Sequence, residues 1–416
     1  MTGEIFIGIE SVGRQAMYGV ACNAQGTILG ACKQSDGVSF YTTPTDELLP
    51  RFQSVLEHLR TIVNGSDSGC PEWTDRSKLN IAIGLTGINS RFDAEHADYV
   101  LKEIDSIDNA ELCIVGDVET AFVGSTMAVD GTAIFVSAGS VVASFENGAV
   151  TRQGGWGPAF TDDGSAYQIG RDALRLIAEW TDRKKIGSAE FRHDEESMTK
   201  LWKSMDIWMQ YPESFIDFPV NLRATGWADT AAEWRRVRRL FLTLNPKENL
   251  PDALVSFAYS VLRKSVPAWW NFVASLSIPI IKEWNITTDA VTKIDPINEI
   301  MSRFVTLLDE RFGQISGRIG EGRRSMPCVL CGGLLNHHPK LAEVVRQRIQ
   351  QSHPSLTKFV HLKDGTTCRP VMGSLLLALG RCDGINLRIP KATIVNRIRE
   401  QMNDQKSAWS DLLKNE

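Results

Sequence analysis

The stretch best equipped for chemistry is GGWGPAFTDDGSAYQIGRDAL, from Gly154 to Leu174. Glycines and Trp156 precede the adjacent acids Asp162 and Asp163, and apolar residues at helical spacing follow them. Glycine lets the backbone approach a ligand closely, and a carboxylate accepts hydrogen bonds from hydroxyl groups. The stretch therefore predicts a loop that delivers polar groups into a cleft, followed by a helix.

Asp117 is a second candidate acid, because it follows the apolar segment ELCIV and one glycine. A Gly-Asp pair after a strand is typical of a turn or a helix cap. A carboxylate at the end of a strand can also orient a substrate hydroxyl and accept its proton. These residues alone favour the turn or helix cap.

The elements that must position these acids follow an α/β pattern with mixed sheets. Alternating apolar residues predict three antiparallel strands over residues 4–33, and the same plan returns from Thr132 to the GGWG motif. Helical periodicity predicts a helix over 47–65, and KLNIAIGLTGI predicts a buried strand. The repeated plan predicts two lobes of related fold. Residues 171–310 are expected to be mostly helical, with their many tryptophans packed in cores and interfaces.

The amino-acid composition limits the kinds of molecule that the protein is expected to bind. The 416 residues are enough for two or three domains, and 45 basic against 50 acidic residues give a formal net charge of -5. This balance predicts no nucleic-acid or anionic-membrane surface and favours a small-molecule partner. No apolar run approaches the roughly 18 residues of a membrane span, so a soluble protein is expected. The eight scattered cysteines, including the Cys328/Cys331 pair, are expected to be buried free thiols, which favours a cytoplasmic protein.

The GGWG motif followed by TDDGSAY resembles the GGWG and GDEGSAY motifs of the N-acetylglucosamine kinase group, which also contains the BadF/BadG/BcrA/BcrD-type ATPases. This group belongs to the acetate and sugar kinase, heat-shock-70 and actin superfamily, and the resemblance covers roughly 1–180 and 325–382. It implies two ribonuclease H-like (actin-like ATPase) lobes around a nucleotide and sugar cleft. The lobes are expected over 1–117, with a C-terminal helix 385–416 packed on it, and over 118–384, with a helical insert about 183–310.

The resemblance also assigns roles to residues. It makes Asp117 the catalytic base, and it assigns a Mg²⁺ site to Glu10 and Asp117. Substrate contact is implied for Trp156 and Asp162, besides Asp117, and Tyr41 falls near the place of a sugar-contacting asparagine of the family. The residues that correspond to ATP-contacting segments of the family are Gly13, Arg14, Gly139, Ser140, Gly332, Gly333 and Gly373.

The phosphate loops depart from the family pattern. Ser11-Val12-Gly13-Arg14 stands where the family has three glycines and a threonine, and Ser137-Ala138-Gly139-Ser140 stands where it has Gly-Thr-Gly-Ser. Arg14 either supplies positive charge to a phosphate or fills the space of the phosphates. Gly87-Ile88-Asn89 stands where the family has a glycine-aspartate pair.

The leading hypothesis is an ATP-dependent kinase that converts an amino sugar, N-acetylglucosamine, to its 6-phosphate with ATP and Mg²⁺. The altered loops motivate an alternative, a catalytically weak or inactive sugar- or nucleotide-binding regulator. A third hypothesis, an ATPase that activates a partner through a bridging iron–sulfur cluster, is disfavoured because Cys328 and Cys331 lie in the expected nucleotide strand. The resemblance makes a homodimer the candidate assembly.

Overall fold

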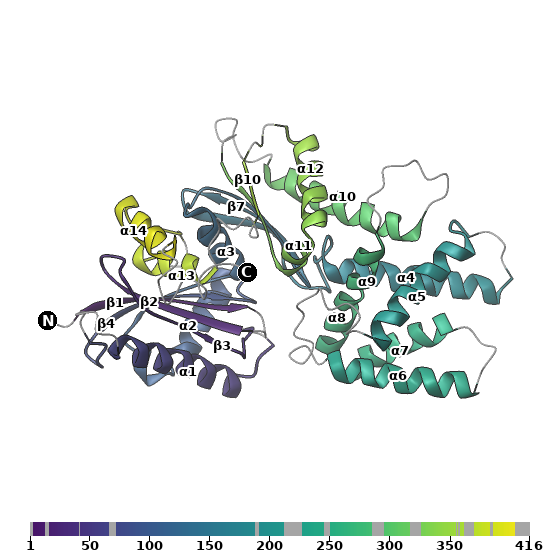
Figure 1. Ribbon diagram of the computed structural model, residues 1–416, viewed down its shortest axis with the longest axis horizontal. Coiled ribbons are helices and arrows are strands. Elements are labelled where there is room, and N and C mark those ends of the chain that lie inside the picture. The colour runs from purple at the N-terminus through teal and green to yellow at the C-terminus, as the bar shows by residue number, and fades with distance from the viewer. Residues whose placement is uncertain are drawn as a thin grey trace.

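The computed structural model describes residues 3–12, 16–40, 42–65, 72–187, 191–211, 227–244, 250–284, 295–316, 326–354, 356, 358–361, 370–382 and 386–403. It contains two mixed sheets, each built around an antiparallel meander (Figure 1). Of the sequence-predicted site residues, Gly13, Arg14 and Tyr41 lie outside the described residues.

The first lobe is built on a sheet with the strand order β3-β2-β1-β4-β5. Strands β1 (Glu4–Val12), β2 (Ala16–Asn23) and β3 (Ile28–Gln34) pair antiparallel, as the alternating apolar pattern predicted. Strands β4 (Lys78–Leu85) and β5 (Glu111–Val115) extend the sheet in parallel. Helices α1 (Thr45–Asn64) and α2 (Arg91–Leu101) connect these strands, and their buried faces form a core with one face of the sheet.

The second lobe repeats this plan with the order β10-β9-β6-β7-β8. Strands β6 (Gly131–Val136), β7 (Ser140–Glu146) and β8 (Ala149–Gly154) form its meander. Strands β9 (Cys328–Cys331) and β10 (Phe359–His361) run parallel to β6. The repeated strand plan in the sequence is thus confirmed as two sheets of matching topology.

Helices of the second lobe cover the outer face of its sheet and extend away from it, on the right of Figure 1. Buried tryptophans such as Trp180, Trp208 and Trp234 fill this core, as expected from the sequence. The helices are α4 (Ala166–Lys185), α5 (Glu195–Gln210), α6 (Trp227–Leu244), α7 (Leu250–Lys264), α8 (Val266–Ser275), α9 (Ser277–Glu283), α10 (Pro296–Ser316), α11 (Gly333–His337) and α12 (Pro339–Ser352).

A central apolar layer joins the two sheets. It is formed by α3 (Asp117–Thr126) and α13 (Pro370–Leu379), which pack against each other, with α14 (Ala392–Asn403) beside them. A Cβ at Gly373 of α13 would lie 2.0 Å from the carbonyl oxygen of Thr120 on α3, and one at Gly8 of β1 would lie 2.4 Å from the amide nitrogen of Leu375. Both glycines are therefore needed for the close approach of α13 to its neighbours.

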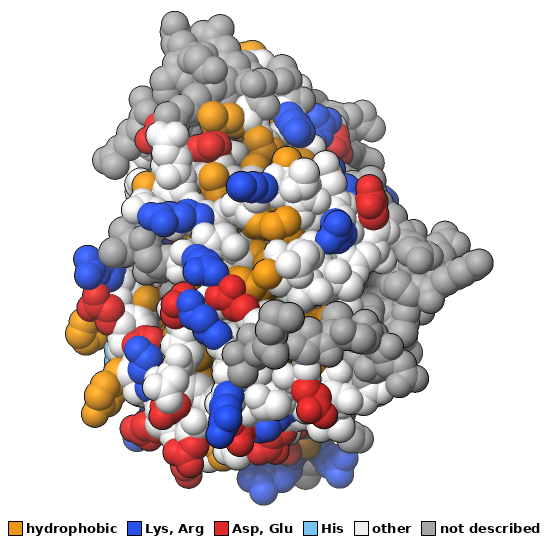
Figure 2. Space-filling view, turned by 90° about the vertical axis from the view of Figure 1, so that its left-hand side faces the viewer, with side chains coloured by type: hydrophobic (Ala, Val, Ile, Leu, Met, Phe, Trp, Pro, Cys, Tyr) orange, Lys and Arg blue, Asp and Glu red, His pale blue; other side chains and the backbone are white. Residues whose placement is uncertain are grey.

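The surface agrees with the nearly balanced composition. On the face shown in Figure 2, basic and acidic side chains are interspersed over the first lobe. No helix among the described residues is long and apolar enough to cross a membrane.

Candidate functional site

Asp117 begins α3 directly after β5, at the carboxyl end of that parallel strand. The Thr86 hydroxyl, just past the end of β4, donates a hydrogen bond of 3.1 Å to Asp117 Oδ2. Burial raises the pKa of Asp117 above its ordinary value, while the Arg152 guanidinium and the Thr86 hydroxyl lower it. The helix N-terminus and the strand edge thus hold a carboxylate where a parallel sheet usually binds ligands.

Glu10 lies close to Asp117 but deeper in the first lobe. It is only 2% exposed, and Ser374 Oγ of α13 donates a hydrogen bond of 3.2 Å to Glu10 Oε2. A Cβ at Gly84 would lie 1.9 Å from the same oxygen, so β4 must carry glycine beside this acid. Burial holds the pKa of Glu10 well above its usual range, opposed by the Thr120 hydroxyl and reinforced by the charge of Asp117.

Arg152, which the sequence reasoning missed, crosses from the second lobe to the first. From the end of β8 it donates hydrogen bonds to both carboxylate oxygens of Glu119. It also donates to the Ile88 carbonyl at 2.7 Å and to Asn89 Oδ1 at 3.1 Å. Arg152 therefore ties β8 to α3 and to the loop after β4, and it brings positive charge toward Asp117. Its one sequence signal is its place two residues before the GGWG motif.

Asp162 meets the loop between β6 and β7. Its side chain lies against Gly139, where a Cβ would be 2.7 Å from Asp162 Oδ2. Burial raises the pKa of Asp162 to about 6, although the Arg311 guanidinium and the N–H groups of Gly157 and Ser140 lower it. Asp162 Oδ1 is buried and has no hydrogen-bond partner among the described residues. Two segments that the sequence assigned separately, to sugar and to nucleotide, thus come together here.

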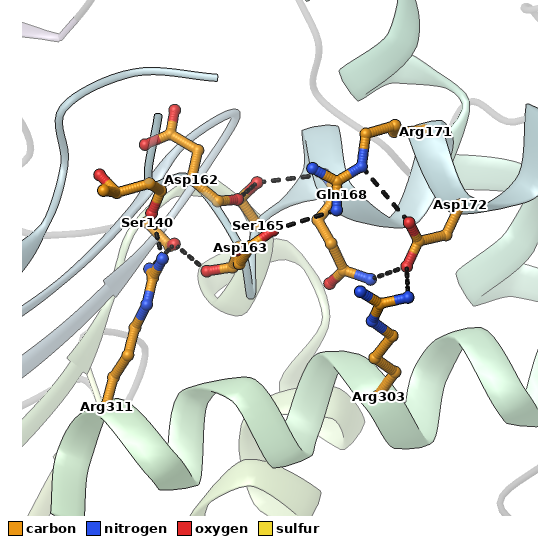
Figure 3. Close-up of polar contacts among 10 residues, drawn as sticks. Ser140, Asp162, Asp163, Ser165, Gln168, Arg171, Asp172, Arg303 and Arg311 are labelled. Carbon is orange, nitrogen blue, oxygen red and sulfur yellow. Dashed lines mark hydrogen bonds and ion pairs between the residues drawn. The ribbon is translucent and has the colours of Figure 1, made fainter. Parts of the chain in front are cut away.

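Asp163, its neighbour, faces away from this contact. Its carboxylate pairs with Arg171 of α4 at 3.0 Å, as Figure 3 shows. Its carbonyl oxygen accepts a hydrogen bond of 2.7 Å from Ser140 Oγ. Ser165 caps α4 by accepting a hydrogen bond from the Gln168 N–H, which fixes the end of the loop. The two adjacent acids therefore have different environments and can have different functions.

Of the remaining sequence-predicted residues, Gly332 and Gly333 lie beside the β6–β7 loop, whereas Gly373 lies where α13 packs on α3. Gly332 has φ +96, and a Cβ there would lie 2.3 Å from the Val136 carbonyl oxygen, beside the β6–β7 loop. A Cβ at Gly333 would lie 4.0 Å from Ser137 Oγ of that loop. Gly373 instead faces α3, as described above. Trp156 is 58% exposed, so its ring is accessible to a ligand.

The buried Glu10 and the half-buried Asp117 fit a divalent cation at the edge of the first lobe. Mg²⁺ prefers carboxylate oxygens and water, and in kinases it takes one or two protein carboxylates besides phosphate oxygens. Burial raises the pKa of both Glu10 and Asp117, and the charge of Asp117 raises that of Glu10 further. A cation between them would relieve the cost of keeping both carboxylates ionised. No group of three or more His, Cys, Asp or Glu side chains able to hold a metal by itself occurs in the described part of the chain.

Comparison with known proteins places this geometry in context. A curated N-acetyl-D-glucosamine kinase of Dictyostelium discoideum is 24% identical over 387 residues, which cover 91% of this chain and 99% of that protein. The crystal structure of a candidate N-acetylglucosamine kinase from Chromobacterium violaceum superposes with a TM-score of 0.52 at 15% identity, covering 91% of this chain and 100% of that one. No protein-family model matches the chain. The chain is therefore similar over most of its length to an N-acetyl-D-glucosamine kinase, as its motifs indicated, and it shares the α/β fold of the Chromobacterium structure.

Proposed function

We propose that the protein is an ATP-dependent sugar kinase whose substrate is an amino sugar, N-acetylglucosamine, phosphorylated on its 6-hydroxyl. The observation that carries the proposal is the contact between Asp162 and Gly139. It places a buried carboxylate oxygen without a described partner beside a loop that resembles a phosphate loop. Similarity to a curated kinase over nearly the whole chain supports the same assignment.

In this reaction Asp117 orients the sugar hydroxyl and takes its proton while the oxygen attacks the γ-phosphorus of ATP. A bond forms between the sugar oxygen and the γ-phosphorus, and the bond from that phosphorus to the β–γ bridging oxygen breaks, which releases ADP. Asp162 accepts a hydrogen bond from another sugar hydroxyl. Trp156 offers an apolar face to the sugar ring.

The surrounding residues prepare Asp117 for this role. The Arg152 charge and the Thr86 hydroxyl both favour its ionised form, which is the form that can accept a proton. Glu10 and Asp117 would hold Mg²⁺, mainly through water. When bound, the ion supplies positive charge that neutralises the phosphate oxygens.

Release of ADP with ATP and Mg²⁺ tests the proposal, with N-acetylglucosamine, glucosamine, N-acetylmannosamine and glucose as acceptors. We expect turnover on N-acetylglucosamine that Asp117→Asn abolishes. Asp162→Asn should weaken sugar binding, whereas Asp163→Asn, which changes the neighbouring acid that faces Arg171, should have a much smaller effect. Turnover that is unchanged in Asp117→Asn would refute the assignment of the base.

The departure of Ser11–Arg14 from the family's glycine loop keeps one alternative, a regulator that binds sugar or nucleotide without turnover. Saturable sugar binding with no ADP release would favour it over the kinase. The Cys328/Cys331 pair does not support the iron–sulfur hypothesis, because both residues are fully buried in β9. A bridging cluster needs cysteines at a surface that a second subunit can reach.

A further inference from the structure

Arg311 belongs to α10, far along the chain from the cleft segments, yet its guanidinium lies between them (Figure 3). Nη1 donates a hydrogen bond of 2.8 Å to Ser140 Oγ, at the start of β7 directly after the β6–β7 loop. Nη2 donates to the carbonyl oxygen of Thr161, the residue before Asp162. One side chain therefore contacts both the nucleotide-side loop and the sugar-side loop.

The burial of this arginine is costly. Arg311 is 9% exposed, and its hydrogen-bond partners are a hydroxyl and a carbonyl group rather than a carboxylate. A buried cation without a bidentate carboxylate partner pays a large desolvation cost, which the nearby charges of Asp162 and Asp163 only partly offset. A purely structural link between two loops does not need a charged group, so this arrangement points to a role in the site.

The GGWG motif contributes space for it. Gly154 has φ +86, and a Cβ at that position would lie 2.8 Å from Arg311 Nη1. The first glycine of the motif therefore leaves room for the guanidinium. The GGWG motif and Arg311 of α10 are therefore sterically complementary at Gly154.

Building on the proposed kinase function, we propose that Arg311 is a positioning residue that couples the two halves of the cleft. The two terminal nitrogens of its guanidinium bind Ser140 Oγ and the Thr161 carbonyl oxygen. A shift of the nucleotide-side loop therefore moves the backbone that carries Asp162. Binding of a nucleotide therefore raises the affinity for the sugar, and the sugar raises the affinity for the nucleotide by the same factor.

The same α10 helix offers a matched control. Arg303 lies two turns earlier on α10, is also drawn in Figure 3, and faces Asp172 at 3.6 Å instead of the loops. We would measure the Kd of N-acetylglucosamine by calorimetry with and without ADP for the wild type, Arg311→Met, Arg311→Lys and Arg303→Met. The ratio of the two Kd values is the coupling.

We expect nucleotide to tighten sugar binding of the wild type by at least about fivefold, the lower end of typical coupling. The ratio should fall to about one in Arg311→Met and should persist in Arg303→Met. Arg311→Lys should lose most of the coupling, because one ammonium group cannot reproduce the two-armed contact. If Arg311→Met fails to fold, the Kd ratio of Arg311→Lys still tests the proposal.

A pH titration of sugar binding gives a second readout. The charged groups that face Asp162 are Arg311 from α10 and Asp163 from its own loop. Loss of the Arg311 charge should raise the pKa of Asp162, because that charge stabilises the carboxylate. As the pH is lowered, sugar binding should therefore begin to weaken at a higher pH in Arg311→Met than in the wild type. A merely structural effect would lower the affinity equally at every pH.

The outcomes separate the inference from the proposed function. A wild type that neither binds sugar nor releases ADP would contradict the kinase proposal itself. A wild type that does both, with a Kd ratio of one or a ratio unchanged in Arg311→Met, would overturn the coupling and leave the kinase intact.

Discussion

Replacement of Asp162 by asparagine should make the protein more stable at neutral pH while it weakens sugar binding. Burial raises the pKa of Asp162 from 3.8 to about 6, so the folded state holds the proton more tightly than the unfolded state does. Each unit of pKa corresponds to about 1.4 kcal/mol, and the ionised side chain therefore costs about 3 kcal/mol in the folded protein. Asparagine has a similar shape and carries no charge to bury.

The pH dependence gives this prediction its sign. Between about pH 4 and 6 the folded state is protonated at Asp162 and the unfolded state is ionised, so the wild type loses stability as the pH rises through this range. Above pH 6 both states are ionised and the cost is constant. The free energy of unfolding of Asp162→Asn should therefore exceed that of the wild type by about 3 kcal/mol above pH 6, and the difference should fall toward zero near pH 4.

Denaturant unfolding at several pH values measures the difference in free energy of unfolding between the two proteins. Asp163→Asn is the matched control, since that carboxylate is half exposed and pairs with Arg171. An Asp162→Asn protein that is less stable than the wild type at pH 8 would refute the reasoning. So would a stability difference that does not change between pH 4 and 8.

Three further changes have definite outcomes. Gly373→Ala should destabilise the protein by about 1 to 3 kcal/mol or more, because the new Cβ would lie 2.0 Å from an α3 carbonyl oxygen, and thermal unfolding measures this. Arg152→Met should cost about 3 to 5 kcal/mol in denaturant unfolding, since it leaves a buried α3 carboxylate without its partner; a loss below 1 kcal/mol would contradict the inter-lobe tie. Cys328, whose pKa burial raises to about 12, should resist iodoacetamide in the folded protein and react after unfolding; rapid labelling at pH 8 would show that β9 is accessible.

Much of the fold could be predicted because its signals are local. The period-2 pattern over 4–33 and its return after Thr132 predicted both meanders, and the periodicity of 47–65 predicted α1 within two residues at each end. The apolar setting of Cys328 and Cys331 predicted two buried thiols. Such patterns report burial directly, so they needed no knowledge of distant contacts.

The contacts within the site depend on residues far apart in sequence, and the sequence did not reveal them. Arg311 is one of two arginines on the amphipathic helix α10, where a charged residue is usually exposed. Arg152 likewise occupies a strand position with no motif of its own. Asp162 and Gly139 were each assigned from a separate motif, and only the fold brings them into contact. The roles assigned to Gly13, Arg14 and Tyr41 stay predictions.

The packing of α13 on β1 has a consequence for biosynthesis. One face of the first sheet packs mainly against α13, with α3 and α14 beside it, and α13 and α14 follow almost the whole chain. At about 5 to 20 residues per second, a ribosome needs roughly 20 to 70 seconds to pass from β1 to α13. During that time the apolar side chains of the first strands are open to chaperones or to aggregation. The lobe that is synthesised first must therefore be the one that is completed last.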